Sequence, residues 1–176
     1  SSTIDNRYDA RIDWTRTDRH TMFARFTIAR QNDDPAILFS TPAETSYYAR
    51  NPREQLSWGN TFIVSPTFVV NVQVGGGRWS EMNFSPAQGY DATKLGFSPA
   101  LTSRFDVNAP PTFSMSDYTS LGYGRNLNGV RQIFSLQLGA TKELGAHSVK
   151  FGYSYQSTML NFTDSNSPSF SFSRLF

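Results

Sequence analysis

The stretch DNRYDARIDWTRTDRHTMFARFTIARQ, residues 5–31, decides the fold because it alternates twice between apolar and polar residues. A period of two places successive side chains on opposite faces of a β-strand. The break between the two runs, Thr17-Asp18-Arg19-His20, is short and polar, so residues 6–31 are predicted to form an antiparallel hairpin. Its apolar face would carry Tyr8, Ala10, Ile12, Trp14, Met22, Ala24, Phe26 and Ile28.

The same paired alternation returns twice along the chain, over residues 55–79 and 130–160. The predicted turns are Ser65-Pro66-Thr67 and residues 143–147. Phe170 and Phe172 are expected to begin a seventh strand. The chain is therefore predicted to contain three hairpins of long strands.

The hairpins are separated by two long polar segments, residues 32–54 and 85–129, which are rich in proline, glycine, serine and asparagine. Short turns at one end and long loops at the other are typical of outer-membrane barrels, and strands of about 10 residues can cross a bilayer. The turn at residues 17–20 is therefore predicted to be periplasmic, and the two long loops are predicted to be extracellular. A soluble antiparallel sandwich also alternates, but its strands average about 5–6 residues and its loops are short. The predicted fold is all-β: antiparallel up-and-down strands forming part of a transmembrane outer-membrane β-barrel. Residues 1–176 would be one partial barrel domain.

Composition excludes several classes of function. The 16 basic and 14 acidic residues give a net charge of +2, which offers no electrostatic basis for nucleic-acid binding. The chain has no cysteine, so disulfides and thiolate metal sites are excluded. It also lacks an apolar run long enough for a transmembrane helix, which needs about 18 residues or more.

Several motifs resemble the barrel of TonB-dependent outer-membrane transporters, and more narrowly the Oar-like receptors of acidobacteria and similar organisms. The matching pieces are NRYDARID at residues 6–13, TDRH at 17–20, MFARFT at 22–27, FIVSPTFVVN at 62–71 and FGYSY at 151–155. Those receptors combine a carboxypeptidase-regulatory-like domain, a plug and a barrel.

The resemblance implies a 22-stranded barrel closed by a plug, of which this chain would supply six strands. It also implies location in the outer membrane, contact with lipid, the plug and the rest of the barrel, and energised uptake through the TonB complex. The substrate stays open among small molecules, glycans and peptides. Two alternatives remain: a soluble β-domain that binds carbohydrate or assembles a surface, and a passive porin-like barrel. Phe176 is similar to the terminal aromatic of outer-membrane proteins, although Arg174 and Leu175 break the alternation and favour an interrupted strand.

The charged residues of the first hairpin do not form a catalytic pair. Asp9 and Asp13 share one face of a strand but lie about 13 Å apart, which is too far for paired acid–base work. We expect Asp9, Arg11 and Asp13 to form a charge ladder with Arg25 that faces the lumen and the plug. The two histidines lie in separate turns, so no metal site, cofactor or enzymatic activity is expected. Gly75-Gly76-Gly77 is expected to mark a bend or a place where another backbone approaches closely.

Aromatic residues in the two long loops are the candidate ligand-binding groups, because exposed rings can stack on sugars or cover an apolar ligand. The alternative is that they pack together and order the loops. The candidates are Tyr47, Tyr48, Tyr90, Phe97, Tyr118 and Tyr123, with Phe105 and Phe113 nearby. Trp14, Trp58 and Trp79 are expected at the membrane interface.

Overall fold

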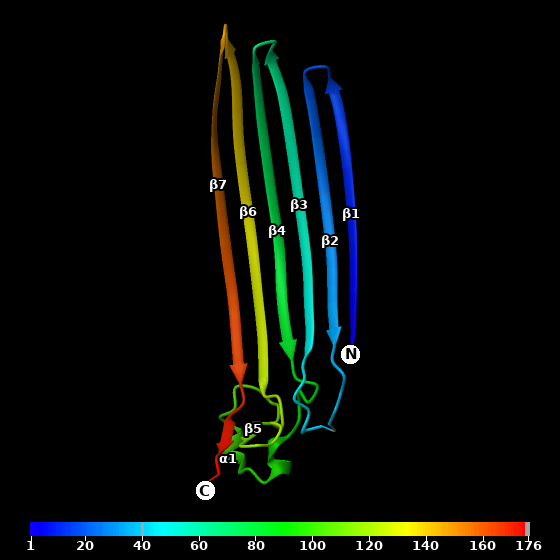
Figure 1. The fold of residues 1–176 in the computed structure, drawn as a ribbon, viewed down its shortest axis with the longest axis vertical. Helices are drawn as coiled ribbons and strands as arrows, with labels where there is room; N and C mark the ends of the chain where they lie inside the picture. The colour runs from blue at the N-terminus through cyan, green and yellow to red at the C-terminus, as the bar shows by residue number, and fades with distance from the viewer. Residues whose placement is uncertain (40, 175–176) are drawn as a thin grey trace.

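Six long antiparallel strands form one open sheet, and a small folded cap lies at one end of it (Figure 1). The computed structural model describes residues 1–39 and 41–174, so the expectation about Phe176 lies outside the described residues. The strand order β1-β2-β3-β4-β6-β7 joins only neighbours in the chain, apart from the pairing of β4 with β6. The strands are β1 (Ser2–Thr17), β2 (His20–Asp34), β3 (Tyr48–Ser65), β4 (Phe68–Phe84), β6 (Arg125–Leu144) and β7 (His147–Asn166).

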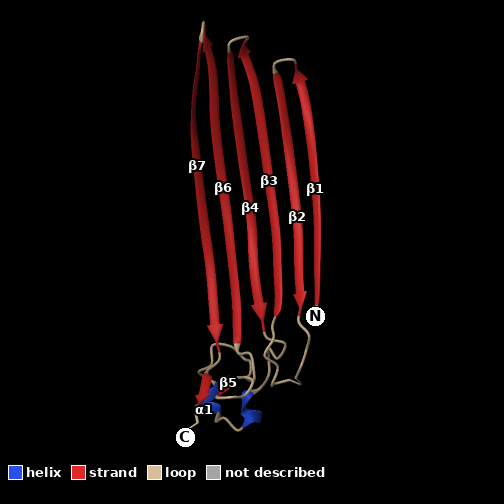
Figure 2. Cartoon of the chain, in the orientation of Figure 1, coloured by secondary structure: helices blue, strands red, loops and turns tan. Residues whose placement is uncertain are grey.

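The three hairpins turn at the places that the sequence predicts. The connecting residues are Asp18-Arg19, Pro66-Thr67 and Gly145-Ala146. Gly145 has φ 63°, a left-handed conformation that glycine adopts without steric cost. All three turns lie at one end of the sheet and both long connections lie at the other (Figure 2).

The register brings together the faces that the alternation predicts. In the first hairpin Arg11 pairs with Arg25, which places the polar positions of β1 and β2 side by side. Ile12 pairs with Ala24, so the apolar positions also coincide. Each face of the sheet is therefore continuous across the hairpin.

The strands extend further toward the loop end than the alternation indicates. The connections shorten to residues 35–47 and 85–124, compared with the expected 32–54 and 85–129. At this end both faces carry polar side chains, as at Asp33 and Asp34 or Arg125 and Asn126, so period-two hydrophobicity is lost while backbone pairing continues.

The cap is built from the longer connection and the chain that follows β7. Phe170 and Phe172 do form a strand, but β8 pairs in parallel with β5 and does not extend the six-stranded sheet. The cap elements are η1 (Ala92–Leu95), α1 (Pro99–Thr102), β5 (Thr112–Met115) and β8 (Ser169–Phe172).

The sheet is a single layer, so it has almost no core of its own. Large apolar side chains stay open on one face, with Ile12 exposed by 72% and Phe151 by 61%. In the described residues no second layer covers them, which a soluble sandwich would require. The described residues also contain no helix that is long and apolar enough to cross a membrane. Buried apolar residues are few: Ala49, Ala87, Ala92, Val107, Ala109, Leu127 and Ala140.

Candidate functional site

One face of the sheet, the apolar face, is continuous across all six strands. Cross-strand pairing aligns one apolar residue from each strand in a single row, because paired residues share a face. That row is Ile12, Ala24, Trp58, Val74, Leu136 and Tyr155.

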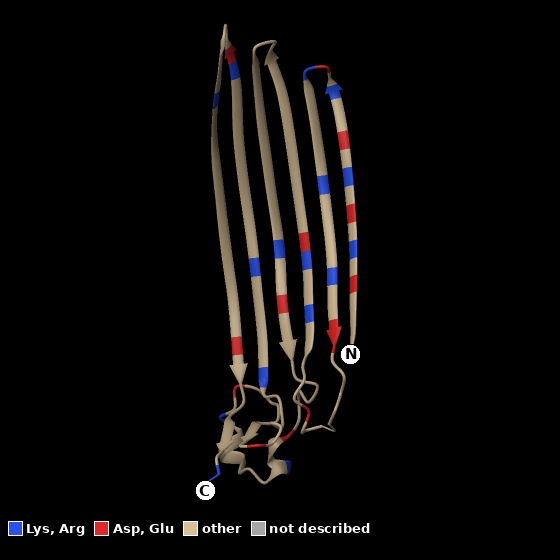
Figure 3. Ribbon diagram, in the orientation of Figure 1, with Lys and Arg blue, Asp and Glu red and all other residues tan. Residues whose placement is uncertain are grey.

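Four strands each contain a stretch without charged residues, which begins at or just below the turns and covers much of the turn-side half of the sheet (Figure 3). A transmembrane β-strand needs about 9–11 residues when tilted. Each of these charge-free stretches meets that length, and the register sets them at the same level. They are residues 55–65 of β3, 68–77 of β4, 132–141 of β6 and 151–163 of β7.

Polarity returns on the apolar face just beyond this zone. Arg30 and Glu54 form an ion pair at 2.6 Å, and Arg78 is the cross-strand neighbour of Glu54. The strands continue, since β6 and β7 each have 20 residues, a length of about 66 Å against a hydrocarbon core of about 30 Å. The loop end of the sheet therefore projects into water even when the strands are tilted.

The opposite face, the polar face, carries the charge ladder of the first hairpin. Asp9 accepts hydrogen bonds from Arg25 at 3.0 Å and from the Thr27 hydroxyl at 2.6 Å. Arg11 and Asp13 form a second ion pair at 2.7 Å. All these side chains are exposed, so each pair contributes little to stability, about 0–1 kcal/mol.

The strand glycines are concentrated on the polar face, so few side chains project from that face at these positions. In the register Gly59, Gly75, Gly77, Gly129, Gly139 and Gly152 all share this face, whereas Gly76 lies on the apolar one. Over Gly59 the missing side chain is replaced by the ring of Phe23, and the Arg11 guanidinium lies 4.6 Å from that ring. Aromatic cover of a strand glycine stabilises the pair and fixes register.

Replacing Gly59 by alanine is expected to force Phe23 off its strand neighbour, because the new Cβ would occupy the position of the ring. We expect a loss of about 1–3 kcal/mol in unfolding free energy, as for other overpacked sites. Urea unfolding in detergent micelles measures it. Gly139→Ala is the matched control, since no atom lies within 4 Å of its added Cβ. Equal effects at both positions would contradict the packing argument.

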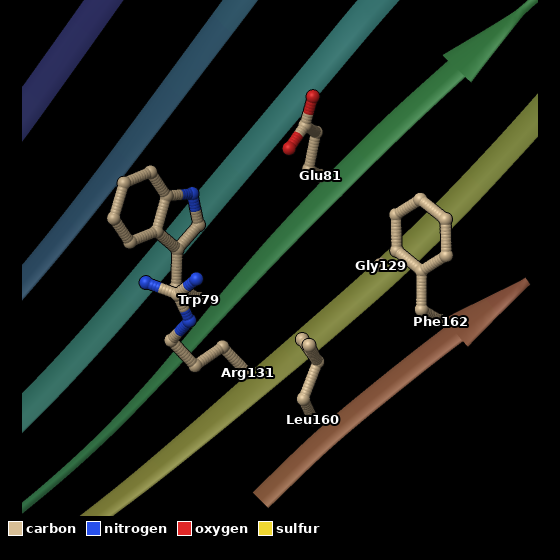
Figure 4. A pocket seen from close by; sticks show the side chains of 6 residues that line it. All are labelled: Trp79, Glu81, Gly129, Arg131, Leu160 and Phe162. Atoms are coloured by element: carbon tan, nitrogen blue, oxygen red, sulfur yellow. The ribbon is translucent and has the colours of Figure 1, made fainter. Parts of the chain in front are cut away.

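A shallow hollow lies beside Trp79 on the polar face, and Trp79 is one of the residues that line it (Figure 4). Arg53, Trp79 and Arg131 lie side by side on β3, β4 and β6, and they pair in register. The guanidinium of Arg53 lies 4.3 Å from the indole centroid and that of Arg131 lies 5.7 Å from it. The hollow has a volume of about 200 Å³ and is lined by Trp79, Glu81, Gly129, Arg131, Leu160 and Phe162.

The place of Trp79 differs from the expectation that all three tryptophans form an interfacial girdle. Trp14 and Trp58 do lie on the apolar face, but Trp79 is on the polar one. Its position in a row with two arginines depends on the register. A cross-strand row of this kind has no signal in a single strand's sequence.

The loop aromatics are brought together in pairs and clusters. Tyr47 stacks on Tyr123 at 5.2 Å, and this contact joins the two long connections. Tyr48 begins β3 and packs beside Phe84 at 5.5 Å. Tyr90 is half-buried, whereas Tyr118 is 71% exposed.

Phe97 belongs to a ring cluster inside the cap. Its ring lies 5.5 Å from that of Phe170 and 6.4 Å from that of Phe113, and Phe105 meets it edge-on at 6.2 Å. Stacked rings at these distances stabilise by about 0.5–1.5 kcal/mol per pair beyond their buried area. The cluster links β5, β8 and the loop that precedes them, so the ring of Phe97 helps to hold these segments together.

Glu44 organises the shorter connection and is the most buried charged side chain described, at 1% exposure. Its Oε2 accepts the N–H groups of Leu38 and Phe39 at 2.8 and 2.9 Å, and its Oε1 accepts those of Thr45 and Ser46. These hydrogen bonds, first that from Phe39, lower the pKa of the carboxyl to about 2. No sequence pattern marks Glu44 as a buried, loop-ordering residue.

Among the described residues no group of three histidine or acidic side chains could hold a metal ion. His20 contacts two residues of the neighbouring strand β3. Its Nε2 is hydrogen-bonded to the Asn60 side chain at 2.8 Å, and its ring stacks on Phe62. His147 lies next to the third turn. The two histidines therefore lie on different hairpins.

A sheet with an apolar face of bilayer height and a polar opposite face is a section of the wall of a transmembrane β-barrel. The chain belongs to the family described as outer membrane beta barrel domain, whose model matches residues 1–176. The protein is thus located in the outer membrane, where lipid surrounds the apolar face. No curated protein and no solved structure matches the chain.

Proposed function

We propose that this barrel wall belongs to a TonB-dependent, Oar-like receptor that takes up a scarce nutrient. The observation that carries the proposal is the polar face, where six strand glycines leave few projecting side chains. The same face carries the charge ladder of Asp9, Arg11, Asp13 and Arg25. Glycine in a strand interior often marks a bulge, a bend or a place where a ligand or another backbone approaches closely. A plug domain inside the barrel is such a body, and an open porin has none filling its lumen.

The proposed mechanism is energised binding and release without covalent chemistry. Substrate would bind from outside, between the long loops and the plug, and the TonB complex would then pull on the plug. Tyr47 and Tyr123 stack where the two connections meet, so they are the loop aromatics best placed to bridge both loops to a ligand. Tyr48, Tyr90, Phe97 and Tyr118 complete the proposed loop set.

The unpaired edges of β1 and β7 support a larger barrel. Within the described residues neither edge pairs with a further strand, and the backbone N–H and C=O groups of such an edge cannot remain unpaired in hydrocarbon. The smallest common bacterial barrels have eight strands, so six strands need further partners. The proposal places those partners in the same barrel.

Planar-bilayer conductance of the full-length protein separates the receptor from a passive porin. A plugged receptor is expected to stay closed in salt and to retain the TonB carboxy-terminal domain in a pull-down. Steady open channels without TonB binding would replace the proposal by the porin. Heat-modifiable migration on gels is the control for a folded barrel.

A further inference from the structure

We infer that the hollow beside Trp79 is a binding site for an oxyanion, carboxylate or phosphate, attached to an apolar or aromatic body. The inference deepens the proposed function and rests on it in one respect, namely that the polar face lines the lumen. It does not depend on how transport is driven.

Two guanidiniums beside Trp79 define the anion-binding part of the site: Arg131 lines the hollow itself, and Arg53 lines the adjoining hollow, which shares Trp79 and Arg131 with it. Arg53 and Arg131 form no ion pair with any described residue, whereas most other arginines of the sheet do. Both lie against the same indole, which restricts their positions. Arginine N–H groups held in place in this way form charge-assisted, often bidentate, bonds to carboxylate or phosphate.

The apolar part of the site lies on the β7 side of the hollow. Leu160 pairs with Arg131 across the strands and is 61% exposed, and Phe162 is 56% exposed over Gly129. Gly129 lines the hollow together with Trp79 and Phe162, and the Phe162 ring lies against the position that a side chain at Gly129 would occupy. A ring or aliphatic group attached to the anion would cover these exposed surfaces.

Glu81 places a negative charge next to the two arginines, and this charge allows a test of whether the ligand is an anion. It lines the hollow on the loop side of Trp79 and forms no ion pair with either arginine. Its carboxylate repels an anion, so removing its charge should strengthen binding while removing an arginine weakens it. A role that is only structural predicts no such opposition of sign.

The long loops of outer-membrane barrels are extracellular, so a hollow on the loop side of the membrane-crossing zone is open to ligands from outside. Trp79 lies on the loop side of the charge-free zone, which ends at Gly77 in β4. A ligand that enters between the loops would reach this hollow before the part of the wall that crosses the membrane.

The test uses the full-length protein in detergent and saturation-transfer NMR titrations with four probes. Phenyl phosphate and benzoate carry an anion on a ring, benzyl alcohol carries the ring alone, and inorganic phosphate carries the anion alone. We expect saturable binding of the first two and much weaker binding of the others. The order of phenyl phosphate and benzoate distinguishes a phosphate ligand from a carboxylate ligand.

Four variants locate the binding. The double variant R53Q/R131Q should weaken phenyl phosphate by at least about tenfold, the loss of one charge-assisted hydrogen bond or more. Glu81→Gln should tighten it by roughly threefold, as expected for one exposed charge. Arg78→Gln is the matched control, because it removes the same charge from the adjacent residue on the apolar face. Trp79→Leu should weaken both ring-bearing anions.

Unchanged binding in R53Q/R131Q, equal binding of benzyl alcohol, or weaker binding in Glu81→Gln would each overturn the inference. Heat-modifiable migration verifies that every variant folds. Steady channel conductance together with arginine-dependent binding would contradict the plugged receptor but support the binding site. TonB binding without arginine-dependent binding would contradict the binding site but support the receptor.

Discussion

Replacing Leu136 by arginine is expected to prevent assembly of the barrel in the membrane. Leu136 lies in the row that is apolar on all six strands, at the middle of the charge-free stretch of β6. An arginine on the lipid face near the bilayer midplane costs about 2–4 kcal/mol. The yield of heat-modifiable protein in the outer-membrane fraction, and the unfolding free energy in lipid vesicles, measure the effect.

The matched control is the next residue of the same strand. Gln137 lies on the polar face, so Gln137→Arg adds the same side chain where water or a plug can accept its charge. We expect this variant to assemble at nearly the wild-type level. If both variants assembled equally well, the apolar face would not face lipid.

Replacing Glu44 by glutamine is expected to unfold the connection over residues 35–47. One carboxylate oxygen becomes an NH₂ group, which cannot accept the two backbone N–H groups that the oxygen held. Each buried donor left unpaired costs about 1–3 kcal/mol. Limited proteolysis should then cleave the loop, and the Tyr47–Tyr123 contact should be lost with it.

Glu54→Gln is the control, because this carboxylate is half-exposed and bonds only one arginine. The loop should keep its protection from protease in that variant.

The stability of the wild-type loop should also depend on pH. Because folding lowers the pKa of Glu44 from 4.5 to about 2, its contribution is complete above about pH 4.5 and is lost as the pH falls toward 2. Amide NMR signals of Leu38 and Phe39 would follow this loss, and their constancy down to pH 2 would contradict it.

The sequence predicts the hairpins well because the membrane imposes a simple pattern on them. Within the charge-free zone one face must be apolar and the other can be polar, so residues such as Val70, Val72 and Val74 alternate cleanly. The turn positions also follow, since Asp18, Pro66 and Gly145 interrupt that pattern.

The loop end could not be predicted in the same way because water surrounds it. The last residues of β2 and the first of β6 are polar on both faces. The sequence of these paired segments therefore does not alternate between apolar and polar residues. Glu44 orders its loop through backbone N–H groups, and these have no sequence signature. The Trp79 hollow depends on three strands that meet only through the register.

The pairing of β5 with β8 predicts an order of events during folding. Because β8 follows β7 in the chain, we expect its residues to reach the loop end after the third hairpin has brought Asn166 beside Arg125. Before that, β5 would lack its pairing with β8, and the ring of Phe113 would lack its contact with that of Phe170. We therefore expect the cap to be the last part of this segment to close. Protection of residues 112–115 from protease in a folding time course would report that β6 and β7 are already paired.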